Sequence, residues 1–101
     1  MQYLELSSPE NITVKDEDYN DVTKTITHYK INIVNIYFEK EELHFLVEKG
    51  FFKNNIFMTV KADAKILTET DYTNIISNFS HDNLYQYLID NEGISGTVVT
   101  V

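Results

Sequence analysis

The stretch TKTITHYKINIVNIYFEK, residues 23–40, constrains the fold more than any other part of the sequence. From Tyr29 to Ile33, apolar and polar side chains alternate, as they do in a strand with one buried face. The phase then shifts by one residue at Val34, and the apolar series continues to Phe38. A β-bulge that bends a long strand produces this shift, and burial of both faces explains the same pattern without a bulge. Either reading predicts one long strand.

Four shorter segments also have the pattern of strands. Residues 3–6 and 12–15 are short strands, separated by the turn sequence SSPEN, which contains Pro9. In residues 56–66 the apolar side chains share one face and mostly charged side chains share the other, which predicts a half-exposed antiparallel strand. The final GTVVTV, residues 96–101, is rich in β-branched side chains and predicts a strand inside the sheet or at its edge.

Two segments near the C-terminus have the spacing of amphipathic helices. Apolar residues recur at helical spacing over residues 72–79, with Thr70 as the predicted N-cap. The same spacing recurs over residues 84–89, where Ser80 can cap the helix and Gly93 ends it.

Residues 41–49 fit two structures. From Leu43 to Val47 the apolar side chains match both the alternation of a strand and one face of a helix. Acidic residues precede this segment and Lys49-Gly50 closes it, as is common at the two ends of a helix. These end signals favour a helix.

The length of 101 residues predicts a single compact domain, residues 1–101. We expect an α+β fold, in which two to three short helices pack on a twisted antiparallel sheet or a partly open β-barrel. The absence of cysteine excludes disulfides and thiolate metal sites. No signal peptide and no apolar run near the roughly 20 residues of a membrane span are visible. We therefore expect no membrane association, and a location in the cytoplasm of a host cell or in a virion.

The charge of the chain is its most unusual property. Sixteen Asp and Glu residues face eight lysines and no arginine, which gives a net charge of −8. Because Lys and Arg make the phosphate contacts of nucleic-acid-binding proteins, direct binding of nucleic acid is not expected. Such a charge attracts basic surfaces, although it also serves solubility alone.

The segment KDEDYNDVTK resembles a binding site more than any other stretch. Asp16, Asp18 and Asn20 occupy the first, third and fifth positions of a calcium loop. The motif fails where it is most constrained, because Asp21 stands in place of the glycine and Thr27 in place of the bidentate glutamate. We predict no metal site, and interpret the segment as a solvated hairpin loop or an acidic contact surface.

Residues for catalysis do not form a recognisable pattern. His28, His44 and His81 lack the short spacing of zinc ligands, and His28 has no obvious carboxylate partner. The adjacent carboxylates Glu41 and Glu42 diverge on either a strand or a helix, and no serine lies in a glycine elbow. We expect neither enzymatic activity nor a cofactor.

Two functions remain. The first is an inhibitor that binds and occludes the basic surface of a partner, expected to be a nucleic-acid-binding protein. The alternative is a structural subunit of a phage tail or baseplate, a homo-oligomer in which residues 3–6 and 96–101 pair as edge strands with neighbouring copies. The residues expected to contact a basic partner are acids and one tyrosine: Glu10, Asp16, Glu17, Asp18, Tyr19, Asp21, Glu39, Glu41, Glu42 and Glu48.

The composition supports both hypotheses. It lacks Arg and Cys, is rich in Asn, Ile, Lys and Tyr, and looks like that of small proteins encoded by phages and mobile elements of AT-rich bacteria. Among these, compact acidic anti-defence proteins, including anti-CRISPR inhibitors, resemble the first hypothesis. Small tail proteins with a β-barrel and one helix resemble the second. No motif carries the resemblance, so it implies no role for any single residue.

Overall fold

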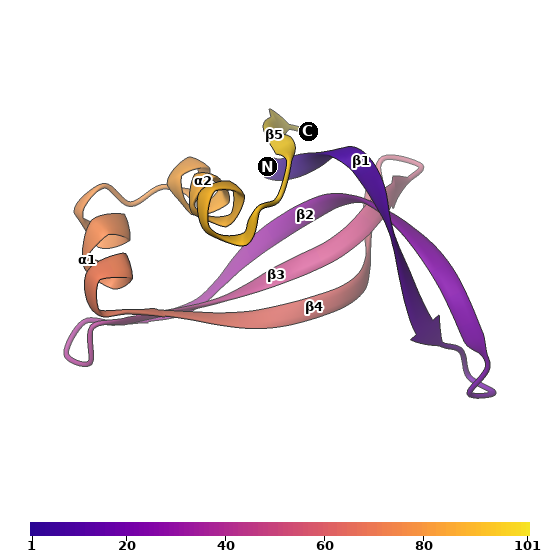
Figure 1. The fold of residues 1–101 in the computed structure, drawn as a ribbon, viewed down its shortest axis with the longest axis horizontal. Coiled ribbons are helices and arrows are strands. Elements are labelled where there is room, and N and C mark those ends of the chain that lie inside the picture. Colours follow the sequence, from indigo (N-terminus) through magenta and orange to yellow (C-terminus); the bar gives the residue numbers. More distant parts are fainter.

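The protein is an open antiparallel sheet with two helices on one face. The computed structural model describes residues 1–101, and the sheet has the strand order β4-β3-β2-β1-β5. Figure 1 shows both helices above the same face of the sheet. The elements are β1 (Gln2–Lys15), β2 (Asp21–Tyr37), β3 (Glu42–Lys53), β4 (Ile56–Thr68), α1 (Glu69–Ser77), α2 (His81–Glu92) and β5 (Gly96–Thr100). The predicted α+β class with an antiparallel sheet is confirmed, with two helices.

The long strand and its bulge are also confirmed. β2 runs from Asp21 to Tyr37, and its pairing with β3 shifts register between Ile33 and Asn35. The extra residue, Val34, is exposed. The shift keeps Ile31 and Ile36 on the helix-covered side, although they lie five residues apart.

The predicted helix at 41–49 is wrong, because residues 42–49 lie in β3 and Glu41 lies in the turn before it. Leu43, Phe45 and Val47 are all buried against the helices, as the alternation of a strand requires. β3 is paired on both sides, with β2 and with β4, and these ladders outweigh the local end signals. Gly50 is not a helix stop, because it lies at a register shift where β3 and β4 approach closely.

The N-terminal segments form one strand instead of two. β1 is continuous, and the predicted turn at 7–11 is an irregularity in its pairing with β2 between Glu5 and Glu10. Within residues 3–6, Leu4 and Glu5 pair with β2 on one side, and all four residues pair with β5 on the other. The assembly hypothesis required residues 3–6 to form an edge strand, and this expectation is wrong. It also required an edge strand at the C-terminus, and β5 is one.

β4 is the predicted strand, but its apolar residues do not share one face. A register shift opposite Gly50 leaves Val60 without a partner, which places Met58 and Ile66 on opposite faces. Ile66 is 55% exposed, while Leu67 is buried opposite Leu43. Polar side chains of β4 consequently face the helices.

The helix signals near the C-terminus were largely correct. Ser80 caps α2 by accepting a hydrogen bond from the backbone N–H of Asn83 at 3.1 Å. Gly93 ends this helix in the left-handed conformation, with φ of 67°. The N-cap of α1 is Thr68 and not Thr70, because the helix begins directly at the end of β4.

Tyr85 joins α2 to the sheet through the core. Its side chain is fully buried, and its hydroxyl accepts a hydrogen bond from the N–H of Ile31 and donates one to the carbonyl of Gln2, both at 2.9 Å. Burial raises the pKa of Tyr85 to about 12, against 10.0 for a free tyrosine. The folded protein therefore holds this phenol in its protonated form.

This burial predicts a loss of stability in alkali. A raised folded-state pKa gives stability that is complete below pH 10 and is lost as the pH rises towards 12. This raised pKa corresponds to about 3 kcal/mol of stability. We expect urea denaturation to show this fall between pH 10 and 12, and a shallower fall for Tyr85→Phe. Equal slopes for the two proteins would contradict this role of Tyr85.

Candidate partner-binding surfaces

A two-stranded arm projects from the sheet. Glu10–Lys15 pairs with Asp21–Ile26, whereas the pairing of β2 with β3 begins only at His28. The arm extends to the lower right of Figure 1, away from the helices. Its base is fixed by Ile26, which is fully buried. An isolated hairpin is marginally stable in water, so this arm depends on its attachment to the core.

Asp16 organises the tip of the arm. Its carboxylate accepts hydrogen bonds from the backbone N–H groups of Asp18 and Asn20, both at 2.9 Å. The backbone N–H of Tyr19 donates to the carbonyl of Asp16, and Tyr19 has φ of 62°. Asp16 therefore closes the turn with the same carboxylate that a calcium loop would use for the ion.

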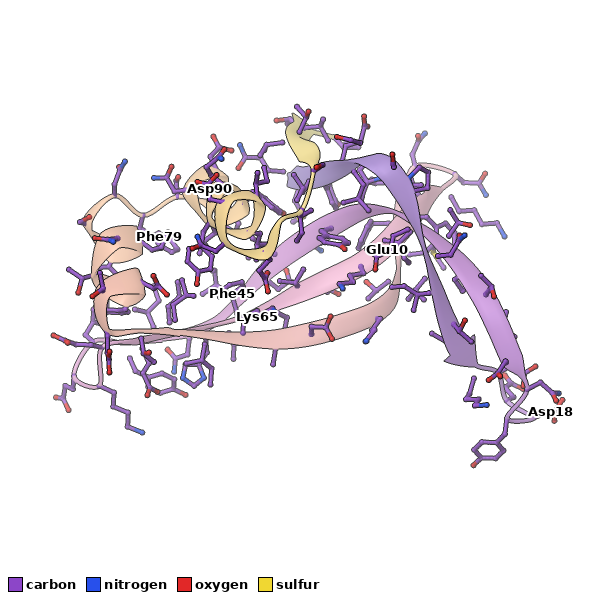
Figure 2. The ribbon with its side chains drawn as sticks, viewed as in Figure 1. Glu10, Asp18, Phe45, Lys65, Phe79 and Asp90 are labelled. Atoms are coloured by element: carbon purple, nitrogen blue, oxygen red, sulfur yellow. The ribbon has the colours of Figure 1, made fainter.

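Three side chains at the tip form no hydrogen bond or ion pair with the rest of the protein. Lys15 forms an ion pair with Asp21, and no ion pair or side-chain hydrogen bond involves the side chains of Glu17, Asp18 or Tyr19. Tyr19 is 83% exposed, and Figure 2 shows Asp18 at the far end of the arm. The tip thus presents two free carboxylates beside a free aromatic ring.

A second acidic group lies at the other end of the molecule. Glu39, Glu41 and Glu42 lie in or next to the β2–β3 turn, which Figure 1 shows opposite the arm along the longest axis, 44 Å in extent. Phe38 in this turn is 68% exposed. Glu42 pairs with Thr68, so the acidic first turn of α1 is close by. Both acidic ends therefore carry an exposed aromatic side chain.

The other two residues of the predicted set lie elsewhere. Glu48 is on the face away from the helices, where its carboxylate accepts hydrogen bonds from Thr59, at 3.0 Å, and from Asn32. Glu10 lies at the base of the arm and accepts a hydrogen bond from the hydroxyl of Tyr29. The ten predicted contact residues are thus divided between two ends and two internal positions.

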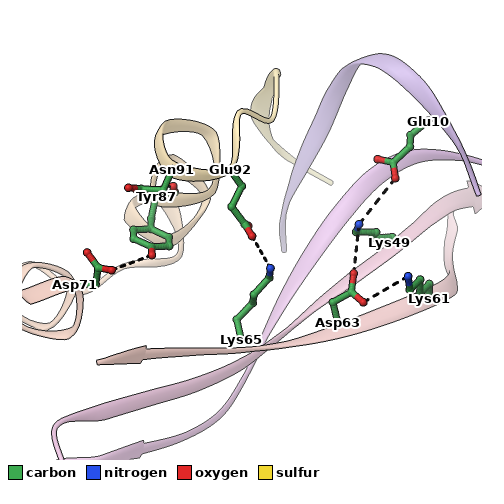
Figure 3. A network of polar contacts seen from close by, with 9 residues as sticks. All are labelled: Glu10, Lys49, Lys61, Asp63, Lys65, Asp71, Tyr87, Asn91 and Glu92. Carbon is green, nitrogen blue, oxygen red and sulfur yellow. Dashed lines mark hydrogen bonds and ion pairs between the residues drawn. The ribbon is translucent and has the colours of Figure 1, made fainter. Parts of the chain in front are cut away.

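A charged hollow between the sheet and α2 was not predicted. Lys49 lies 3.9 Å from Glu10 and 3.3 Å from Asp63, and Lys65 pairs with Glu92 of α2, as Figure 3 shows. The hollow has a volume of about 320 Å³. It is lined by Glu10, Tyr29, Val47, Lys49, Asp63, Lys65, Glu92 and Ile94. In the sequence, Lys61, Asp63 and Lys65 alternate with alanines, and this alternation was the one available signal for charges on a single face of the strand.

Both lysines of the hollow have carboxylate partners. Lys49 also lies over the ring of Tyr29, 5.2 Å from its centre. Burial, reinforced by the hydrogen bond to Glu10, raises the pKa of Tyr29 well above its usual value. Each ammonium group has a carboxylate partner and the phenol stays protonated. These ion pairs connect α2 to β4, and they connect β1 to β3.

Two of the three histidines have partners that the sequence did not reveal. His28 Nε2 lies 3.3 Å from a carboxylate oxygen of Glu5, its partner residue in β1, and its ring packs edge-on against Phe52. His44 Nε2 lies 3.0 Å from Glu42 and its ring packs against Tyr37. No group of three or more His, Asp or Glu side chains is placed to hold a metal ion.

Comparison with known proteins gave no match to a protein family, to a curated protein or to a solved structure. Neither helix is long and apolar enough to cross a membrane. The geometry of the surface is therefore the basis for a functional proposal.

Proposed function

We propose that this chain is a small acidic binding protein that docks on a basic partner and occludes its surface. The observation that carries the proposal is the tip of the arm, where Glu17, Asp18 and Tyr19 extend into solvent without partners of their own. The turn already orders the backbone here, so binding must fix only the side chains of these residues, at about 0.5–1.5 kcal/mol each.

Charge and shape favour a basic partner. The net charge of −8 steers a cationic surface towards the protein and slows its approach to phosphates. Exposed aromatic residues such as Tyr19 and Phe38 can serve as anchors, with the carboxylates around them. The two acidic ends lie along an axis of 44 Å, which suits an extended basic groove.

A nucleic-acid-binding protein is the kind of partner that fits best. Its binding groove carries Lys and Arg side chains that normally contact phosphates, and free carboxylates can take the place of those phosphates. In this proposal the protein is a phage or mobile-element inhibitor of the anti-defence type, acting without catalysis. The affinity is expected to fall as salt is added.

A matched pair of variants tests the proposal. Glu17→Gln with Asp18→Asn removes two charges from the tip, and Asp82→Asn with Asp90→Asn removes two from exposed positions of α2. Both pairs change the net charge from −8 to −6. In pull-downs from a bacterial lysate at low salt, we expect the tip variant to capture about tenfold less of a basic nucleic-acid-binding protein. The α2 variant should capture nearly as much as the unmodified protein.

Release by competitors completes this test. Added duplex DNA and added salt should both elute the captured protein, because DNA competes for the same basic groove. Equal capture by the two variants would show that only overall charge matters, and capture of no basic protein would rule out the proposal.

An assembly subunit of a phage virion is the second candidate. The observation that favours it is β5, an edge strand without charged residues. Because residues 3–6 lie inside the sheet, this hypothesis retains only one of the two edges that it proposed.

A further inference from the structure

The two edges of the sheet are protected very differently. β4 carries the charged residues Lys61, Asp63 and Lys65 on its helix-facing side, and it has a register shift near its middle. Charges on the inner face and bulges are the means by which edge strands avoid pairing with other chains. β5 has neither, because its sequence GTVVT contains no charge and no proline and its register is regular.

The hydrogen bonds of β5 show which of its backbone groups are free. Met1 and Val101 exchange both backbone hydrogen bonds, and the N–H of Ser7 donates to the carbonyl of Ser95. Antiparallel pairs alternate between bonded and non-bonded, so the odd-numbered residues of β5 bond to β1. The N–H and C=O groups of Gly96, Val98 and Thr100 therefore point away from β1, towards an edge that no other strand covers.

We propose that β5 pairs antiparallel with β5 of a second copy, about a two-fold axis at Val98. In this register Val98 is opposite Val98 of the other copy, and Gly96 is opposite its Thr100. All six outward-facing residues of the two strands then form bonded pairs. Thr97 is opposite Val99 in the non-bonded pairs, and no charged side chain lies on either strand.

A second copy of the chain can pair with every free backbone group of this edge. The free groups are spaced symmetrically about Val98, so the edge is complementary to itself, as a two-fold interface requires. β5 lies at the upper border of the molecule in Figure 1, away from the arm and from the β2–β3 turn. Pairing here keeps the acidic ends of the two copies apart. The proposal is independent of any partner of the arm.

The first test uses proline at a position that spares the protein's own ladder. Thr100 is exposed and its N–H is free, so Thr100→Pro removes two symmetric hydrogen bonds from the dimer and none between β1 and β5. Analytical ultracentrifugation across a wide concentration range should show a monomer–dimer equilibrium, weakened about tenfold or more by this variant. Urea denaturation at low protein concentration should be nearly unchanged. A monomer at all concentrations, or a dimer that Thr100→Pro leaves intact, would overturn the proposal.

The second test fixes the register with cysteines, because the natural chain has none. A Thr97→Cys copy mixed with a Val99→Cys copy should form a disulfide-linked dimer under mild oxidation, since non-bonded antiparallel pairs bring side chains close. A mixture of Thr97→Cys with Thr100→Cys is the matched control, because these side chains lie on opposite faces of the sheet. Cross-linking that is equal in the two mixtures would contradict the proposed pairing.

Discussion

Replacing Phe45 with alanine is expected to lower the free energy of unfolding by about 4 kcal/mol, as large-to-small changes of buried aromatic residues do. Phe45 is 1% exposed and lies on the middle strand of the β2–β3–β4 ladder, beneath the helices in Figure 2. Its neighbours belong to both layers, so the cavity cannot be closed by moving one flexible segment. Equilibrium urea denaturation followed by circular dichroism measures the change.

Phe79→Ala provides the matched comparison for this substitution. Phe79 is 40% exposed and lies between the two helices, where Figure 2 labels it. The same change in side-chain volume should cost about 1 kcal/mol here, because solvent already reaches the ring. Similar losses for the two variants would show that the core does not lie where β3 meets the helices.

Gly50→Ala is expected to cost about 3 kcal/mol or more, although it adds a single methyl group. A Cβ at this position would lie 2.0 Å from the carbonyl oxygen of Met58 and 2.9 Å from the ring of Phe57. The ring can move, but the carbonyl belongs to the backbone of β4. The β3–β4 ladder must therefore open locally, and thermal unfolding should show a clearly lower midpoint.

Gly93→Ala separates the cost of a steric clash, expected at Gly50, from the cost of a left-handed backbone conformation. Gly93 has φ of 67°, and a Cβ there would meet no atom within 4 Å. Gly93→Ala should cost about 1 kcal/mol, the usual penalty of a left-handed alanine. If Gly50→Ala were no worse than Gly93→Ala, the close approach of β3 and β4 would be in doubt.

The parts of the fold that follow from local signals could be predicted from the sequence. The Ser80 cap, the Gly93 stop and the phase shift before Asn35 each depend on a few neighbouring residues. Residues 41–49 could not be assigned in this way, because their pattern suits both a helix and a strand. Two flanking strands, which are distant in sequence, decide the outcome.

The positions of the site residues depend even more on long-range pairing. The acidic loop of Asp16–Asp21 could be recognised in the sequence. Its position at the tip of an arm, at the opposite end of the molecule from Glu39–Glu42, could not be predicted. The hollow was missed because Lys49 meets Glu10 and Asp63 only once the sheet has formed. Lys65 meets Glu92 only when α2 folds over the sheet. The inward direction of Asp63 results from the register of β4, which the residues of β4 alone do not determine.

The exposed turn of the arm can change in sequence without destabilising the fold. Glu17, Asp18 and Tyr19 form no hydrogen bond or ion pair through their side chains, so substitutions at these positions should cost the fold little. Variation among natural forms of this protein should then concentrate in that short turn, while the residues beneath the helices stay constant.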